Sequence, residues 1–239
     1  MGQVVTFSEL PATATADGID KAPIAADVKE IAAEVVRIAP GKRWTETVPR
    51  GSDCYLFMLS GAGTVAAAGD EHRFPTQAFA TIQENTEFTV DNGATVTAEV
   101  MKVIAPPKPA ERPLKGFADG LSVMERGTAP MSELPGDHKI RLYFVDKEAA
   151  KSERGHAMIV IYDKETVTSM HMHPDAESMF VVLDGAIEFV VNGENVVVKP
   201  GRAAIFGMSD RHGLRVADGL TAASFLEFHV PAAYTTVKG

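Results

Sequence analysis

The chain has 239 residues, of which 45% are hydrophobic and 23% charged, a globular composition that excludes global disorder. Its 32 acidic and 23 basic side chains give a formal net charge of −9. We therefore expect no nucleic-acid partner, because affinity for phosphates needs clustered basic residues. No apolar run approaches the roughly 20 residues of a membrane span and the start of the chain lacks a secretion signal, so we expect a cytoplasmic protein with no membrane partner.

The chain in sequence order predicts strands far more than helices. Apolar and β-branched runs recur between turn signals, and Asn-Gly or Asp-Gly pairs typical of hairpins lie at 92–93, 184–185, 192–193 and 218–219. The predicted strands are 54–59, 64–68, 79–82, 87–90, 95–104, 157–162, 178–183, 187–191, 195–198, 203–206 and 222–230. Few short helices are expected, at 24–33 and 147–154. The only cysteine, Cys54, starts an apolar strand, which predicts a buried, unreactive thiol and excludes an intrachain disulfide.

A proline-rich segment divides the chain into two similar parts. Residues 105–113 contain four prolines, which cannot form a central strand and predict an extended connector. In each part an acid, an apolar strand and a glycine turn are followed by shorter strands. This weak repeat predicts two all-β barrels or jelly rolls, with domains at 1–105 and 136–239 joined by a connecting segment at 106–135.

The residues that point most strongly to chemistry lie in the second part. His171 and His173 are two apart, so in a strand they project to one face. Pro174 then turns the chain, and Glu177 opens the next strand, from which it can point back into the same interior. His212 follows a later strand and turn, and it completes a candidate set of three imidazoles and one carboxylate. Such a set suits one divalent transition metal ion and leaves its identity open among Fe²⁺, Mn²⁺, Ni²⁺, Cu²⁺, Co²⁺ and Zn²⁺.

This pattern resembles the cupin superfamily, whose first motif is similar to Gly-(X)5-His-X-His-(X)3,4-Glu-(X)6-Gly. The motif residues present here are His171, His173, Glu177, Gly185, Pro200, Gly201 and His212. The resemblance implies two tandem cupin jelly-roll barrels, a bicupin, with the metal inside the second barrel. Aligned on the second part, the first carries Thr47, Pro49, Asp53 and Phe88 at the ligand positions. We therefore expect a degenerate first barrel without metal.

The resemblance further implies a metal-dependent enzyme acting on a small organic substrate of the aromatic or keto-acid type. We expect a dioxygenase, an oxidoreductase that binds its substrate directly to the metal, with Fe²⁺ or Mn²⁺ as the favoured ion. One alternative is a dioxygen-independent isomerase, decarboxylase or aminohydrolase similar to the ureidoglycine aminohydrolases, although their ligand order differs from the one found here. The other alternative is a non-catalytic binding protein for a small molecule. Because edge strands of small barrels often pair across a two-fold axis, we expect a homodimer.

Overall fold

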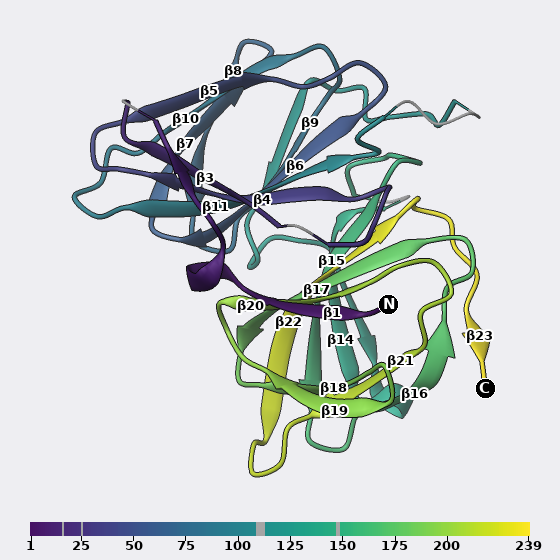
Figure 1. The fold of residues 1–239 in the computed structure, drawn as a ribbon. Helices are drawn as coiled ribbons and strands as arrows, with labels where there is room; N and C mark the ends of the chain where they lie inside the picture. Colours follow the sequence, from purple (N-terminus) through teal and green to yellow (C-terminus); the bar gives the residue numbers. More distant parts are fainter. Residues whose placement is uncertain (16, 25, 109–112, 147–148) are drawn as a thin grey trace.

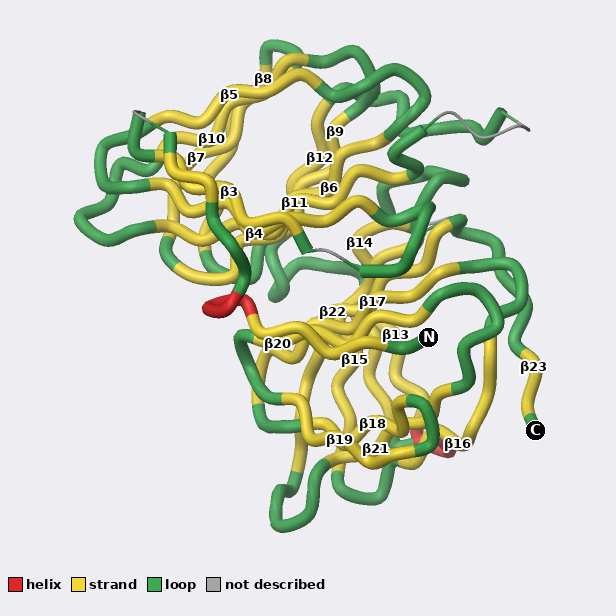
Figure 2. The backbone as a smooth tube through the Cα atoms, viewed as in Figure 1, coloured by secondary structure: helices red, strands yellow, loops and turns green. Residues whose placement is uncertain are grey.

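The computed structural model describes residues 1–239 except 16, 25, 109–112 and 147–148. The described residues contain no α-helix, only two 3-10 turns, η1 (Phe7–Glu9) and η2 (Pro135–Asp137). The all-β prediction is therefore confirmed (Figure 2). No helix in the described part of the chain has the length and apolar character needed to cross a membrane.

Neither predicted helix forms in the described residues. Residues 26–31 make an irregular loop whose Ile31 is buried between the two halves of the molecule. The backbone N–H groups at the end of this loop bond to the carboxylate of Glu177 instead of to helical carbonyls. The second candidate, 147–154, lies partly outside the described residues, and its described part, 149–154, is irregular.

The first barrel combines a seven-stranded sheet with a four-stranded sheet, and all paired strands in them are antiparallel (Figure 1). The larger sheet has the order β12 (Leu121–Met124), β9 (Phe79–Ile82), β6 (Asp53–Ser60), β11 (Ala98–Ala105), β4 (Ala32–Ile38), β3 (Ile19–Pro23) and β2 (Thr13–Ala14). The smaller sheet has the order β5 (Arg43–Thr47), β10 (Glu87–Asp91), β7 (Ala62–Ala67) and β8 (Asp70–Pro75).

The second barrel repeats this plan with seven-stranded and five-stranded antiparallel sheets. The larger sheet has the order β1 (Gln3–Thr6), β20 (Arg202–Phe206), β17 (Glu177–Asp184), β22 (Ala222–Val230), β15 (His156–Asp163), β14 (Lys139–Val145) and β13 (Met131–Leu134). The smaller sheet has the order β19 (Glu194–Val198), β18 (Ile187–Val191), β21 (His212–Val216), β16 (Val167–Met172) and β23 (Val237–Lys238).

The sheets divide the chain at places other than the predicted boundaries 1–105, 106–135 and 136–239. β1, from the predicted first domain, pairs with β20 of the second barrel and lies along it in Figure 1. β12, from the predicted connecting segment, pairs with β9 of the first barrel. Without these partners β20 and β9 would be sheet edges with unpaired main-chain groups, so β1 covers an edge of the second barrel and β12 covers an edge of the first.

Strand alternation sorts the buried apolar side chains into three clusters. In β17, Phe180 points into the second barrel, whereas Met179 and Val181 point into the space between the barrels. In β6, Leu56 points into the first barrel and Phe57 into the same shared space. The two large sheets therefore pack face to face. In β17, only the residues on the same face as Phe180, at every second position, can point into the interior of the second barrel.

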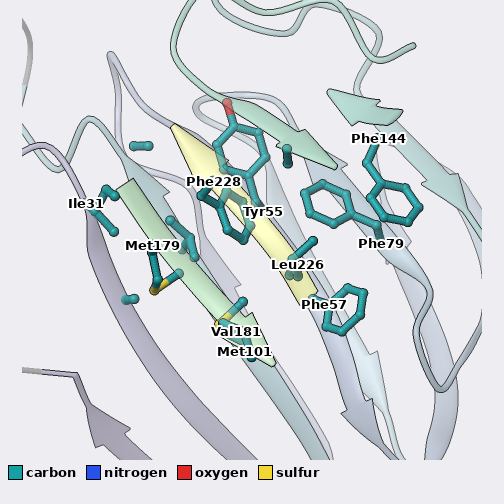
Figure 3. Close-up of a cluster of buried hydrophobic side chains, with 14 of the residues drawn as sticks. Ile31, Tyr55, Phe57, Phe79, Met101, Phe144, Met179, Val181, Leu226 and Phe228 are labelled. Carbon is teal, nitrogen blue, oxygen red and sulfur yellow. The ribbon is translucent and has the colours of Figure 1, made fainter. Parts of the chain in front are cut away.

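The shared cluster joins side chains of both barrels (Figure 3). Phe79 of the first barrel stacks on Phe144 of the second, with ring centroids 4.9 Å apart. Tyr55 approaches Phe228 at 6.1 Å on the same contact surface. Aromatic side chains bury the largest apolar areas, so this cluster holds the two barrels together as one core.

Candidate metal centre

Three imidazoles meet inside the second barrel, as the sequence predicts. His171 lies in β16 and His173 directly follows that strand, while His212 opens β21 opposite His171 in the antiparallel register. One ligand atom from each of the three lies within 4.8 Å of the others, and all three side chains are buried. In the described residues this is the only group of three or more such side chains that could hold a metal ion.

Main-chain carbonyls set the ring orientation of all three histidines. Each Nδ1 faces a backbone oxygen: His171 that of Ser169 at 2.9 Å, His173 that of Thr235 at 3.0 Å, and His212 that of Asp210 at 3.1 Å. A ring that donates from Nδ1 carries its lone pair on Nε2, which is the usual arrangement of a metal-binding histidine. The Nε2 of His212 is buried and has no hydrogen-bond partner among the described residues. A metal ion would satisfy this atom, so the residues present fit one.

Burial keeps these imidazoles in the neutral form that metal binding requires. Burial, followed by the nearby His171, lowers the pKa of His212 to about 3. Burial and the nearby His229 lower the pKa of His173 to about 4. The pKa of His171 is also lowered, mainly by burial.

The fourth predicted ligand, Glu177, is not brought into this group. Its carboxylate accepts hydrogen bonds from the backbone N–H groups of Lys29 at 2.6 Å, Glu30 at 2.7 Å and Ile31 at 3.1 Å. Glu177 has the parity of Met179 and so faces the first barrel, whereas Ser178 has the parity of the inward-pointing Phe180. Glu177 therefore lies on the face of β17 that meets the first barrel and not on the face that lines the second.

We expect Glu177→Gln to keep metal binding while it weakens the contact between the barrels. The Mn²⁺ affinity should stay within about threefold of the parent, because the carboxylate bonds to backbone amides, but the free energy of unfolding should fall by about 1–3 kcal/mol through lost acceptors. Equilibrium dialysis with elemental analysis and urea unfolding measure the two effects, with the exposed Glu194→Gln as control. A tenfold or greater loss of Mn²⁺ affinity would show that Glu177 is a metal ligand and would contradict this prediction.

The structure adds an acid and a fourth histidine that the sequence motif does not include. Glu227 and His229 lie in β22 with the inward parity of Phe225, and His229 Nε2 is 2.6 Å from Glu227 Oε1. The other ring nitrogen, Nδ1, bonds to the hydroxyl of Ser178 at 2.9 Å. The imidazole of His229 lies 4.8 Å from that of His173, measured between ring centroids. Both ring nitrogens of His229 are thus engaged beside the candidate metal site.

Glu227 is ionised in this setting. Burial on its own would raise the pKa of its carboxyl, but the hydrogen bond with His229 and electrostatic interactions with His229, His156 and Arg141 lower that pKa to about 2. The alternation of β22 could have indicated that Glu227 and His229 face the barrel interior, since both share one face with Ala223 and Phe225. It was not decisive, because both faces of this strand are largely buried.

A cavity of about 210 Å³, which we call the inner cavity, is lined by His171, His173 and His229. Two cationic side chains of β14, Lys139 and Arg141, line it together with Glu227. The Nε of Arg141 is buried and lacks a hydrogen-bond partner in the described part of the chain. Lys139 Nζ donates to Thr168 Oγ1 at 3.0 Å. The inner cavity thus places two cationic side chains, one with an unpartnered Nε, beside His171 and His173.

Three further arginines of the second barrel and the cysteine of the first have structural roles. The guanidinium of Arg215 pairs with Glu188 at 2.8 Å and with Asp218 at 2.7 Å, near the surface. Arg202 and Arg211 bond to backbone carbonyls. Cys54 is fully buried, and burial raises the pKa of its thiol to about 12, which agrees with an unreactive side chain.

The first barrel holds ion pairs at the corresponding place. Lys102 Nζ lies 2.5 Å from Glu34 and 2.6 Å from Glu46, and Lys21 also pairs with Glu46. Both ammonium groups lie over the buried ring of Trp44, at 5.8 and 5.9 Å. The ammonium of Lys102 thus supplies positive charge between two carboxylates, where no bound cation is needed.

Strand register relates this cluster to the second barrel. Asp53 opens β6, and three positions later Leu56 pairs with Lys102 in β11. Glu177 opens β17, and three positions later Phe180 pairs with Glu227 in β22. Glu46 pairs with Phe88 as His171 pairs with His212. The sequence alignment places Thr47 at the position equivalent to His171. The strand register shows instead that the neighbouring Glu46 occupies this position.

Fold and site together define a two-barrel cupin architecture with a candidate three-histidine metal centre in the second barrel. Residues 158–229 match the family described as Cupin domain, so the carboxy-terminal barrel is a cupin domain. No curated protein matches the sequence.

Solved structures agree in fold along the whole chain. Protein Ylba from E. coli is 14% identical, with 96% of this chain and 90% of that chain covered and a TM-score of 0.77. A putative glyoxylate induced protein from Pseudomonas aeruginosa is 16% identical, with coverage of 100% and 92% and a TM-score of 0.78. The formate complex of oxalate decarboxylase from Lactobacillus farciminis is 12% identical, with coverage of 98% and 88% and a TM-score of 0.73. At these identities the likeness establishes the bicupin fold alone.

Proposed function

We propose that the second barrel is a metal-dependent enzyme that acts on a small organic carboxylate by dioxygen-independent acid–base chemistry. The observation that carries this proposal is the group of three buried histidines whose Nδ1 atoms face carbonyl oxygens. Three imidazoles held in this way offer three Nε2 lone pairs to one ion. We favour Fe²⁺ or Mn²⁺, because ions that take six ligands would keep open positions for substrate. When bound, the metal would act as a Lewis acid that polarises a substrate oxygen.

The cations of β14 would bind the carboxylate of the substrate. Arg141 has a buried Nε without a partner and its guanidinium can hold a carboxylate through two parallel hydrogen bonds. Lys139 lies two residues away on the same face and adds a second positive charge. An anion in this cavity would satisfy the unpaired donor and orient the rest of the molecule toward the histidines.

Glu227 and His229 would hold and move a proton. Their 2.6 Å contact keeps a carboxylate and an imidazole side by side within reach of the inner cavity. A fixed acid–base pair of this kind suits decarboxylation, isomerisation or hydrolytic deamination, each of which transfers a proton to or from carbon, nitrogen or oxygen. This pair is why we place dioxygen-independent chemistry first.

A dioxygenase, expected from the sequence, is the second candidate. Three protein ligands in place of four would leave a six-coordinate ion with positions for both substrate and dioxygen. This reaction would use the same histidines and the same carboxylate-binding cations. The two candidates differ in whether dioxygen is consumed and in whether Glu227 is required for turnover.

Turnover under defined gas tests this proposal. Protein loaded with Mn²⁺ or Fe²⁺ is incubated with a panel of keto acids and phenolic acids, with and without air, and products are followed by mass spectrometry and dioxygen by electrode. We expect turnover of a carboxylate without dioxygen uptake. Glu227→Gln should then lower kcat by about 100-fold or more while metal content is retained.

Other outcomes identify the alternatives. Turnover that stops without air and is matched by dioxygen uptake would support the dioxygenase and contradict acid–base chemistry. Tight retention of a panel compound without any turnover would support the non-catalytic binding protein. Glu188→Gln, which changes an acid paired with Arg215 outside the inner cavity, serves as the control for loss of one carboxylate.

A further inference from the structure

A second, larger cavity of about 960 Å³ adjoins the inner cavity; we call it the outer cavity. It is formed by side chains of β13, β14 and β15 and by the segment 232–234. Two residues, Arg141 and Tyr234, line both cavities. The two spaces are therefore neighbours separated by these side chains and not independent features of the surface.

The inward-facing residues of β14 and β15 run in order from one cavity to the other. In β14, Lys139 lines the inner cavity, Arg141 lines both, and Tyr143 lines the outer cavity. In the antiparallel neighbour β15, Val160 lines the inner cavity and Met158 the outer one. Alternate residues of one strand share a face and lie about 7 Å apart, so the two cavities follow one another along the inside of the sheet.

Tyr234 stands between the histidines and the outer cavity. Its ring centroid lies 4.0 Å from that of His229 and 4.9 Å from that of His173, and on the other side 6.2 Å from that of His156. Burial raises the pKa of its phenol well above the ordinary value, so the side chain remains an uncharged aromatic wall. A ligand that spans both cavities would pass beside this ring and beside Arg141.

The outer cavity has the surfaces that accommodate an apolar or aromatic group. Met131, Met158 and Pro130 line it with the ring of Tyr143. His156, which also lines it, is uncharged at neutral pH because burial lowers its pKa to about 4. Charged side chains of both signs complete the lining: Lys115, Lys151, Asp146 and Glu153. Their opposite charges do not select for a second anion, whereas thioether and aromatic groups favour an apolar one.

We infer that the outer cavity binds an apolar, preferably aromatic, part of a substrate whose carboxylate end lies in the inner cavity. This inference rests on the proposed function, since it assigns the head of the molecule to Arg141 and the histidines. The inner cavity alone is smaller than the roughly 300–1,000 Å³ of typical ligand sites, whereas the outer cavity lies near the upper end of that range. The substrate class is therefore an arylalkyl or alkyl carboxylate, larger than a two- or three-carbon acid.

Binding of two matched acids to the Mn²⁺-loaded protein tests the inference. Pyruvate and phenylpyruvate share the 2-oxo acid head and differ by one phenyl group. Isothermal titration should give phenylpyruvate a Kd at least about tenfold lower than that of pyruvate, because the phenyl group would be buried in the outer cavity. Equal affinities would overturn the inference while leaving the proposed function intact. Failure of both acids to bind would overturn the proposed function and the inference with it.

A cavity-filling variant localises the effect. Ser132 in β13 pairs with Arg141 in register and lines the outer but not the inner cavity. Ser132→Trp should reduce the affinity ratio of phenylpyruvate to pyruvate to about one, whereas the matched Ser132→Ala should keep it. An unchanged ratio in Ser132→Trp, with metal content and circular dichroism like the parent, would show that the phenyl group binds elsewhere and would overturn the inference.

Discussion

His212→Ala is expected to lower the affinity for Mn²⁺ by about 100-fold or more, with little change in overall fold. Even mutation of residues that only orient metal ligands commonly costs 10–100-fold, and this change removes a ligand itself. The Nε2 of His212 is buried and unpartnered among the described residues, and it faces the two other imidazoles. The barrel should persist, because its apolar core is built from the strands and does not depend on this ring.

Equilibrium dialysis followed by elemental analysis measures this effect, and circular dichroism checks the fold. The double variant His171→Ala/His212→Ala should carry no measurable metal. His72→Ala is the matched control, because His72 is an exposed residue of β8 in the first barrel. Normal metal content in the double variant would contradict the assignment of the centre to this group.

Asp53→Ala is expected to lower the free energy of unfolding by about 3 kcal/mol without loss of metal. The fully buried Asp53 accepts bonds from Arg154 Nη1 at 3.0 Å, the backbone N–H of Phe117 at 3.0 Å and Ser152 Oγ at 2.5 Å. Removing one partner of a buried ion pair leaves the other charge poorly compensated, which typically costs about 3–5 kcal/mol. The remaining contact of Arg154 with Glu84 places the expected value near the lower end.

Urea unfolding and metal analysis of the same preparation test both parts of this prediction. Asp91→Ala is the control: it removes an ion pair with the exposed Arg43 and should cost about 1 kcal/mol or less. The double variant Asp53→Ala/Arg154→Met should regain part of the lost stability, because it removes the charge left behind. If metal content were halved in Asp53→Ala, the first barrel would not be the metal-free partner we expect.

Asp53 and Glu177 occupy equivalent positions in the two barrels and make similar contacts. Each opens an inner strand of the large sheet of one barrel and bonds to a segment that leads into a strand of the other barrel. Asp53 bonds to residues 152 and 154 before β15, and Glu177 bonds to residues 29–31 before β4. The resemblance to the cupin motif identified Glu177 as a ligand because the spacing permits it. The structure gives it the same cross-barrel role as Asp53.

The strands and three of the four proposed ligands follow from local sequence. Alternation, hairpin dipeptides and proline breaks are properties of neighbouring residues, so they predict the all-β fold and the shared face of His171 and His173. His212 could be placed because a Pro-Gly turn, a short strand and a polar turn precede it at the spacing of the second cupin motif. These signals need no knowledge of how the two barrels pack.

Tertiary structure decided the rest, because several strands are buried on both faces. In β17 and β22 apolar residues occupy both parities, so the sequence does not reveal which face lines the barrel and which meets the other barrel. That choice turns Glu177 outward and brings Glu227 and His229 beside the histidines. It also gathers Lys21, Glu46 and Lys102 from three separate strands. The chain by itself determined a pair of β-barrels with a histidine cluster, and only the packing of two large sheets selected the acids that share its cavity.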